Sequence, residues 1–227
     1  MRPTTLVGTA PIPGHAGELR CFHHDGDYTI RVDGIELMST RVHGSEEQLS
    51  ELALQRLGPR AAAHLLVSGL GMGFTLARAL ALASPDTTIT VAELVPEVVT
   101  WNRELFGTKT NHPLRDPRTR LVVGDVGQTL AAHRDAFDAI LLDVDNGPDG
   151  LVRPANDSLY SERGIAIARA ALRAKGVLAV WSAAPAPAFT HRLRQAGFDV
   201  VEHRVRARRT KGPRRTIWIA ERRGAAT

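Results

Sequence analysis

The segment from His64 to Leu76 constrains the fold of this chain more than any other stretch. Its apolar run, Leu65 to Val67, is typical of a buried parallel strand, and an apolar stretch of helical character begins at Phe74. Three glycines at alternate positions separate the two: Gly69, Gly71 and Gly73. Residues without Cβ atoms allow a tight turn and let a ligand approach backbone N–H groups at a helix start. The pattern predicts a strand, a turn and a helix, with the turn serving either as a ligand-binding loop or only as a connection between the strand and the helix.

Acidic residues follow the next two predicted strands. The β-branched run 88–92 ends at Glu93, about 20 residues beyond the glycines, where nucleotide-binding α/β units place the acid that accepts hydrogen bonds from ribose hydroxyls. The strand 120–123 leads to Asp125, which we expect to accept a hydrogen bond from an adenine amino group, with the N–H of Val126 available to a ring nitrogen. Helix capping is the alternative role for both acids.

A fourth buried strand, 137–142, is followed by Asp143 and Asp145. If the chain stays extended, these two side chains share a face, and both can face a ligand at the carboxyl end of the sheet. A carboxylate there could hold an ammonium group or take a proton from an amine nucleophile. We therefore name both as candidate catalytic residues. A loop-ordering turn over 145–148 is the alternative.

The order of the predicted elements defines the fold class. Strands alternate with helices from the first glycine turn onward, which predicts a parallel sheet with helices on both faces. The last two strands, 198–206 and 216–220, have no helix between them and should form an antiparallel hairpin. The expected architecture is an α/β, Rossmann-like sheet that ends in this hairpin.

A small β unit precedes the main domain. Strand-like runs between Glu18 and Met38 are separated by the turn dipeptides Asp25-Gly26 and Asp33-Gly34. We expect a flexible N-terminus over 1–17, the β unit over 18–44 and a nucleotide-binding domain over 45–227. Ser45 should cap the first helix of that domain. The loop 39–44 then lies where a substrate wall could form.

The net charge of +5 comes largely from one cluster near the end of the chain. Its members are Arg204, Arg206, Arg208, Arg209, Lys211, Arg214 and Arg215. A nucleic acid, an anionic substrate or a protein partner could bind such a patch. No aromatic residues interleave with the arginines to stack bases, so a solvated hairpin is favoured over a nucleic-acid interface.

Other features limit the location and the chemistry. The single cysteine, Cys21, cannot form an intramolecular disulfide, no apolar run is long enough to cross a bilayer, and no secretory signal is evident, so we expect a cytoplasmic protein without membrane contact. His23, His24 and His43 lack metal-ligand spacing, and no metal site is expected. A dehydrogenase is disfavoured because the third glycine comes one residue too early for Gly-x-Gly-x-x-Gly.

Four segments resemble the class I S-adenosylmethionine-dependent methyltransferase fold, and more narrowly its spermidine synthase branch: 66–73, 91–93, 123–125 and 137–143. The segment from Ser158 is also similar to the stretch after that branch's active-site loop. The resemblance implies that the three glycines approach the ligand's amino acid portion and that Glu93 holds the ribose. It further places Asp125 at the adenine and Asp143 near the reacting centre, and it implies a homodimer.

The chain departs from the spermidine synthase pattern at three places. Met72 stands where the family's Gly-Gly-Asp-Gly loop has its acid, and Asp143-Val144-Asp145-Asn146 replaces an Asp-Ser-Ser-Asp-like loop. The Tyr-His-Glu segment is absent, and His43-Gly44-Ser45-Glu46-Glu47 stands nearby.

These departures favour one function over its alternatives. The leading hypothesis is a methyltransferase that uses S-adenosylmethionine and a small nucleophilic acceptor, with Asp143 or Asp145 as the base. The first alternative is aminopropyl transfer from decarboxylated S-adenosylmethionine to a diamine. The second is a nucleotide-binding protein without catalysis that acts through its basic hairpin.

Overall fold

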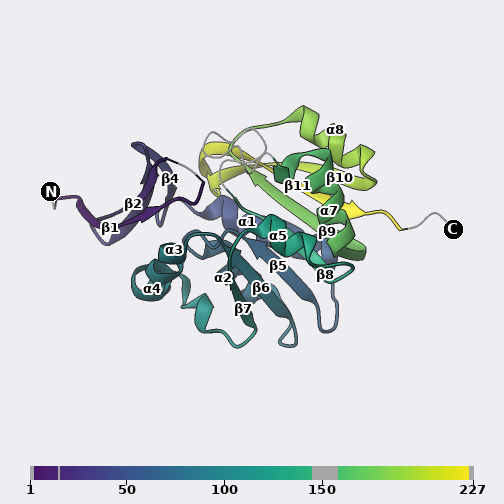
Figure 1. Ribbon diagram of the computed structural model, residues 1–227, viewed down its shortest axis with the longest axis horizontal. Coiled ribbons are helices and arrows are strands. Elements are labelled where there is room, and N and C mark those ends of the chain that lie inside the picture. Colours follow the sequence, from purple (N-terminus) through teal and green to yellow (C-terminus); the bar gives the residue numbers. More distant parts are fainter. Residues whose placement is uncertain (1–2, 15, 145–157, 225–227) are drawn as a thin grey trace.

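A computed structural model describes residues 3–14, 16–144 and 158–224. It contains a four-stranded sheet near the N-terminus and a seven-stranded sheet formed by the rest of the chain. Figure 1 shows the smaller sheet at one side of the larger one; helix α1 packs against the larger sheet. None of the helices in the described ranges is long and apolar enough to cross a membrane.

The smaller sheet is antiparallel, and its strands pair in chain order. They are β1 (Thr5–Pro11), β2 (Glu18–His24), β3 (Asp27–Val32) and β4 (Ile35–Ser39). Asp33 and Gly34 both have positive φ angles, as the predicted hairpin turn requires. The expectation of a flexible N-terminus over 1–17 needs correction, because residues 5–11 form an edge strand. Its apolar Leu6 and Val7 are exposed, so it lacks the buried alternation that sequence reasoning depends on.

The larger sheet has the strand order β10-β11-β9-β8-β5-β6-β7. The strands are β5 (His64–Ser68), β6 (Thr88–Glu93), β7 (Thr119–Val123), β8 (Phe137–Leu142), β9 (Leu172–Ser182), β10 (Phe198–Arg208) and β11 (Lys211–Arg222). β5 to β9 pair in parallel, while β11 runs antiparallel to both β9 and β10. The predicted Rossmann-like sheet with a terminal hairpin is therefore confirmed. The order reverses between β5 and β8, where such sheets bind ligands.

Helices flank this sheet: α1 (Gly44–Leu57), α2 (Phe74–Leu82), α3 (Pro96–Trp101), α4 (Gly107–Thr110), α5 (Val126–Ala131), α7 (Glu162–Ala171) and α8 (Pro187–Gln195). A π-helical turn, Asn102–Phe106, divides the single helix expected over 96–106, and a short 3-10 turn, Pro113–Arg115, follows α4. Ser45 is not the N-cap of α1, which is His43. Ser45 lies inside the first turn, and its hydroxyl donates to Glu46 Oε2 at 2.6 Å.

Burial explains why helices cover both faces of the sheet. Leu65 and Val67 of β5 belong to an apolar cluster that includes Leu76 of α2. Leu66, between them, points to the opposite face and joins a second cluster that includes Leu130 of α5. A strand with apolar residues at every position must be covered twice, as the continuous run 65–67 predicts.

At the amino end of β8, a buried carboxylate ties three elements together. Asp138 accepts hydrogen bonds from the Arg60 and Arg173 guanidinium groups at 2.8 and 2.6 Å, and from the His64 backbone N–H at 2.8 Å. Burial alone would raise the pKa of Asp138, but these contacts offset it and hold that pKa below its ordinary value. This cluster is structural and lies at the end of the sheet opposite the site described next.

Candidate active site

The carboxyl ends of four parallel strands surround one pocket, called the first pocket below. Its wall includes Gly69 after β5, Glu93 at the end of β6, Asp125 after β7 and Asp143 after β8. Gly71 and Val126 also line it. The sequence placed a glycine or an acid at each of these strand ends, and the fold brings them together.

The glycine turn has positive φ angles at all three predicted positions, but the three serve differently. At Gly69 a Cβ atom would collide with the backbone carbonyl oxygen of Asp143, so only glycine lets β5 and β8 end this closely. Gly73 is the N-cap of α2, and a Cβ atom on it would lie only 2.7 Å from Asn102 Oδ1. Gly73 does not line the first pocket. The tight turn accounts for this glycine without a ligand.

Glu93 is 7% exposed, and its carboxylate organises the turn as well as facing the first pocket. Oε2 accepts the Leu70 backbone N–H and Oε1 accepts the Val95 backbone N–H, both at 2.9 Å. Burial raises the pKa of this carboxyl although the backbone donors lower it. The capping role weighed from the sequence is not present, because Val95 is the N-cap of α3 and no side chain caps this helix; Glu93 binds the N–H of Val95 itself. The ribose-binding role remains a prediction.

Asp125 also has a structural partner. It is the N-cap of α5, and its Oδ1 accepts the Gln128 backbone N–H at 3.1 Å. It lines the first pocket together with Val126, so capping and ligand contact are compatible in this geometry. The contact with adenine remains a prediction.

The described wall of the first pocket holds three carboxylates, those of Glu93, Asp125 and Asp143, and no lysine, arginine or histidine. The rest of its described wall is largely apolar and includes Leu37 and Met38 of β4. Such a surface suits a ligand with an apolar body, hydrogen-bond donors and positive charge.

A second pocket adjoins the first, and Asp143 lines both, as do Gly71, Leu37 and Met38. The residues that only the second pocket uses come from distant elements: Ser39, Glu46, Leu70, Met72, Phe74, Thr75 and Trp181. Asp143 is therefore the titratable residue at the junction of the two spaces. Of the loop 39–44, expected to form a substrate wall, only Ser39 lines the second pocket; Leu37 and Met38 of β4 precede that loop.

Two carboxyl groups of the second pocket have perturbed acidity. Burial, with repulsion from Asp143 as the next contribution, raises the pKa of Glu46 to about 7. Burial raises the pKa of Asp143 to about 6, against the hydrogen bond that its Oδ2 accepts from the Thr75 hydroxyl at 2.5 Å. Acids tuned toward neutrality in a cleft are typical of functional sites.

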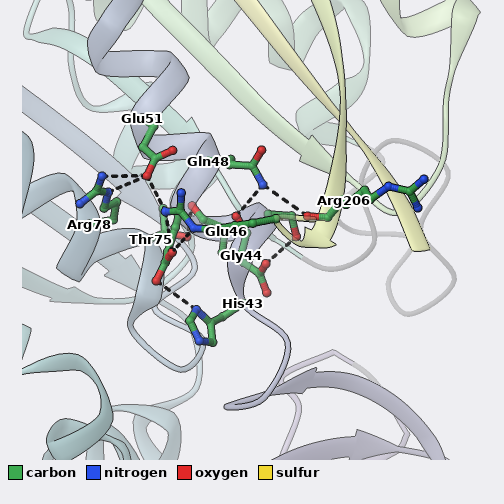
Figure 2. A network of polar contacts seen from close by, with 11 residues as sticks. His43, Gly44, Glu46, Gln48, Glu51, Thr75, Arg78 and Arg206 are labelled. Atoms are coloured by element: carbon green, nitrogen blue, oxygen red, sulfur yellow. Dashed lines mark hydrogen bonds and ion pairs between the residues drawn. The ribbon is translucent and has the colours of Figure 1, made fainter. Parts of the chain in front are cut away.

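Contacts with the C-terminal hairpin hold the start of α1, where Glu46 lies (Figure 2). Gln48 Nε2 donates to the Gly44 carbonyl at 2.9 Å and to the Arg206 carbonyl at 3.3 Å. A Cβ atom on Gly44 would lie 2.8 Å from the Arg209 backbone nitrogen, so the helix and the hairpin tip are in close contact.

The arginine cluster of the hairpin is partly neutralised within the chain. Arg209 pairs with Glu47 and Glu51 of α1 at 2.8 and 2.6 Å, and Arg204 pairs with Glu202 at 3.1 Å. Arg209 thus serves the contact between the hairpin and α1.

Sequence reasoning did not name Glu46, Met38 or Trp181 as site residues, although all three line the second pocket. An acid in the first turn of the helix after the β unit was the available signal for Glu46, but it was assigned to the helix start alone. The candidate Asp145 lies outside the described residues.

The strand order, the reversal between β5 and β8 and the acids around the first pocket define a class I methyltransferase-like fold. A family model described as "Spermine/spermidine synthase domain" matches residues 43–194, and the chain belongs to that family. No curated protein sequence matches significantly.

Solved structures agree on the fold. Spermidine synthase from Thermotoga maritima has a TM-score of 0.75 at 18% identity, over 95% of this chain and 72% of that one. A spermidine synthase in complex with the transition-state analogue AdoDATO has a TM-score of 0.76 at 17% identity, over 95% and 73%. A probable spermidine synthase from Corynebacterium glutamicum has a TM-score of 0.67 at 17% identity, over 96% and 80%. At these identities the likeness establishes the fold alone.

Proposed function

We propose that this chain transfers an aminopropyl group from decarboxylated S-adenosylmethionine to an amine acceptor. The observation that carries the proposal is the junction of the two pockets at Asp143. On one side, the described wall of the first pocket has carboxylates and no lysine, arginine or histidine; on the other side, the second pocket has another carboxyl group, Glu46. Family membership supports the same reaction over the methyl transfer that the sequence favoured.

The first pocket suits the donor. Asp125 and the N–H of Val126 would receive the adenine, and Glu93 the ribose, which leaves the aminopropyl ammonium near Asp143. S-adenosylmethionine carries an additional α-carboxylate, and an anion beside Asp143 would be repelled in a site partly shielded from water. The acid-only wall therefore favours the decarboxylated donor.

The chemistry asks little of the protein beyond alignment and exclusion of water. The lone pair of the acceptor nitrogen forms a bond to the propyl carbon attached to the sulfonium. The carbon–sulfur bond breaks, and its electron pair returns to sulfur to give neutral methylthioadenosine. The proton lost by the nitrogen passes to a carboxylate, and Asp143 and Glu46 are the candidates in the second pocket.

Methyl transfer from S-adenosylmethionine is the second candidate, and Met72 is the observation that favours it. This residue lines the second pocket with an apolar side chain, 4% exposed, where spermidine synthases are expected to carry an acid. An apolar wall there would suit an acceptor other than a polyamine.

Parallel calorimetric titrations with S-adenosylmethionine, its decarboxylated form and methylthioadenosine test the proposal. We expect the decarboxylated form to bind more tightly than S-adenosylmethionine. We also expect Asp125→Ala to weaken every nucleoside ligand about 10-fold or more, as for a lost hydrogen bond to a charged group. Release of methylthioadenosine on adding an amine would complete the test. Preference for S-adenosylmethionine would favour methyl transfer, and binding of none of the three would overturn both.

A further inference from the structure

The wall of the second pocket includes a buried donor that no group among the described residues satisfies. Trp181 of β9 lines this pocket and is 7% exposed, yet its indole Nε1 has no hydrogen-bond partner within the part of the chain that the structure describes. Buried donors without a partner are rare in folded proteins, and each needs an explanation. A ligand atom that accepts a hydrogen bond would provide one.

A cation lies against the same indole. The guanidinium carbon of Arg215, on β11, is 5.6 Å from the centroid of the Trp181 ring. Within the described ranges, Arg215 forms no ion pair or hydrogen bond through its side chain, whereas Arg209 and Arg204 of the same hairpin are paired. Its positive charge also lowers the pKa of Glu46, so its field reaches the carboxyl side of the pocket.

The second pocket is lined by two carboxyl groups, Glu46 and Asp143, and by Trp181, whereas Arg215 lies against the Trp181 ring next to the pocket without being part of its lining. Glu46 and Asp143 attract an amine, whereas the Arg215 guanidinium and the Trp181 N–H attract an anion or another hydrogen-bond acceptor. A protonated diamine has only donors and positive charge, so it would be repelled by Arg215 and would leave the indole unsatisfied. An amine that also carries a carboxylate would complement both sides.

We propose that the acceptor is an amino-carboxylate, with its reacting amine at Glu46 and Asp143 and its carboxylate at Arg215 and Trp181. This inference rests on the proposed transfer to an amine and specifies the acceptor class. The bond changes are those given above: the amine nitrogen gains the propyl carbon, sulfur keeps the electron pair, and the carboxylate of the acceptor is unchanged.

Matched acceptors provide the test because they differ by one carboxylate. Ornithine is 1,4-diaminobutane with an added carboxylate, and lysine has the same relation to 1,5-diaminopentane. With decarboxylated S-adenosylmethionine as donor, we expect kcat/KM for the amino acid of each pair to exceed that for the diamine by about 10-fold or more, the worth of a charge-assisted hydrogen bond.

The variants Arg215→Met and Trp181→Phe identify the residues responsible. Arg215→Met should lower kcat/KM for ornithine and lysine about 10- to 100-fold, mainly through KM, without lowering that for the diamines. Trp181→Phe, which removes only the N–H donor, should have a smaller effect of the same kind. Arg214→Met, at the exposed neighbouring position on β11, is the matched control and should change neither.

Two outcomes would overturn the amino-carboxylate assignment. Turnover of diamines that is faster than that of the amino acids, and unchanged in both variants, would overturn the amino-carboxylate assignment and leave aminopropyl transfer standing. If Arg215→Met weakens binding of S-adenosylmethionine but not of its decarboxylated form, Arg215 serves the donor's carboxylate, which also overturns the assignment.

If no acceptor yields methylthioadenosine, the proposed transfer fails. Calorimetric binding of ornithine to the protein saturated with methylthioadenosine still tests the inference. It predicts binding that Arg215→Met weakens about 10-fold or more, and absence of that binding in the unmodified protein would overturn it.

Discussion

The first and second pockets share Asp143 but are constructed in different ways. The polar residues of the first pocket lie at or just after the carboxyl ends of parallel strands, so the topology of the sheet alone brings them together. The second pocket combines β4, the first turn of α1, the glycine turn and β9, which are brought together by packing between separate parts of the chain. A site of the first kind can be derived from a strand pattern, whereas one of the second kind depends on how the N-terminal sheet and the C-terminal hairpin dock.

Asp143→Asn tests the junction and should have the largest effect. The amide keeps the size of the side chain but cannot take a proton, so we expect kcat to fall about 10²- to 10⁴-fold, the range for a lost general base. Binding of methylthioadenosine, which has no ammonium group, should change little. Steady-state kinetics and calorimetry measure the two effects, and an equal loss in both would place Asp143 in the first pocket alone.

Asp138→Asn changes the same strand at its opposite end and should affect stability only. Its arginine partners are partly solvated, so we expect a loss of about 1.5–3 kcal/mol, the range for hydrogen bonds to a charged group. Because the folded pKa of Asp138 is depressed, the stability it contributes is present above the ordinary aspartate pKa and is lost as pH falls through the folded value. Urea unfolding at neutral and acidic pH measures this effect. A fall in activity per folded molecule would show that the two ends of β8 are coupled.

Glu46→Gln tests how ionisation of a carboxyl group in the second pocket affects stability. The folded pKa of Glu46, about 7, is raised, so the stability it contributes at low pH is lost as pH rises through that value. The variant should therefore be more stable than the parent at pH 8, on the order of 1 kcal/mol or about 2–4 °C in Tm, but not at pH 4. Identical Tm differences at both pH values would contradict this account.

Arg209→Met should have the smallest effect and tests the contact between the hairpin and α1. The Arg209 side chain is 48% exposed, so its pairs with Glu47 and Glu51 should contribute no more than about 1 kcal/mol and should weaken with salt. We expect KM for the acceptor to rise slightly while binding of methylthioadenosine stays constant. Arg208→Met is the matched control, since that exposed side chain has no ion-pair partner in the described ranges. A larger effect on methylthioadenosine binding than on KM for the acceptor would contradict the distinction between the first and second pockets.

The strand pattern predicted the larger sheet, the terminal hairpin and the location of the first pocket, because each follows from local periodicity and from the rule for strand ends. It failed for β1, whose apolar side chains are partly exposed. The expected helix cap was also wrong, because Ser45 is the second residue of α1 and not its N-cap. It also missed Glu46 and Trp181 as pocket residues. Glu46 is one of two adjacent acids in a first helical turn, and Trp181 ends an apolar strand; neither differs locally from residues with structural roles only.

The contact between the hairpin tip and α1 has a consequence for how the molecule is made. Glu46 is synthesised early, but Gln48 two residues later binds the carbonyl of Arg206, which leaves the ribosome long afterwards. The described residues of the first pocket precede residue 145, whereas Arg215 follows all of them. During synthesis, the described wall of the first pocket is therefore translated before Arg215, to which we assign the acceptor carboxylate, becomes available.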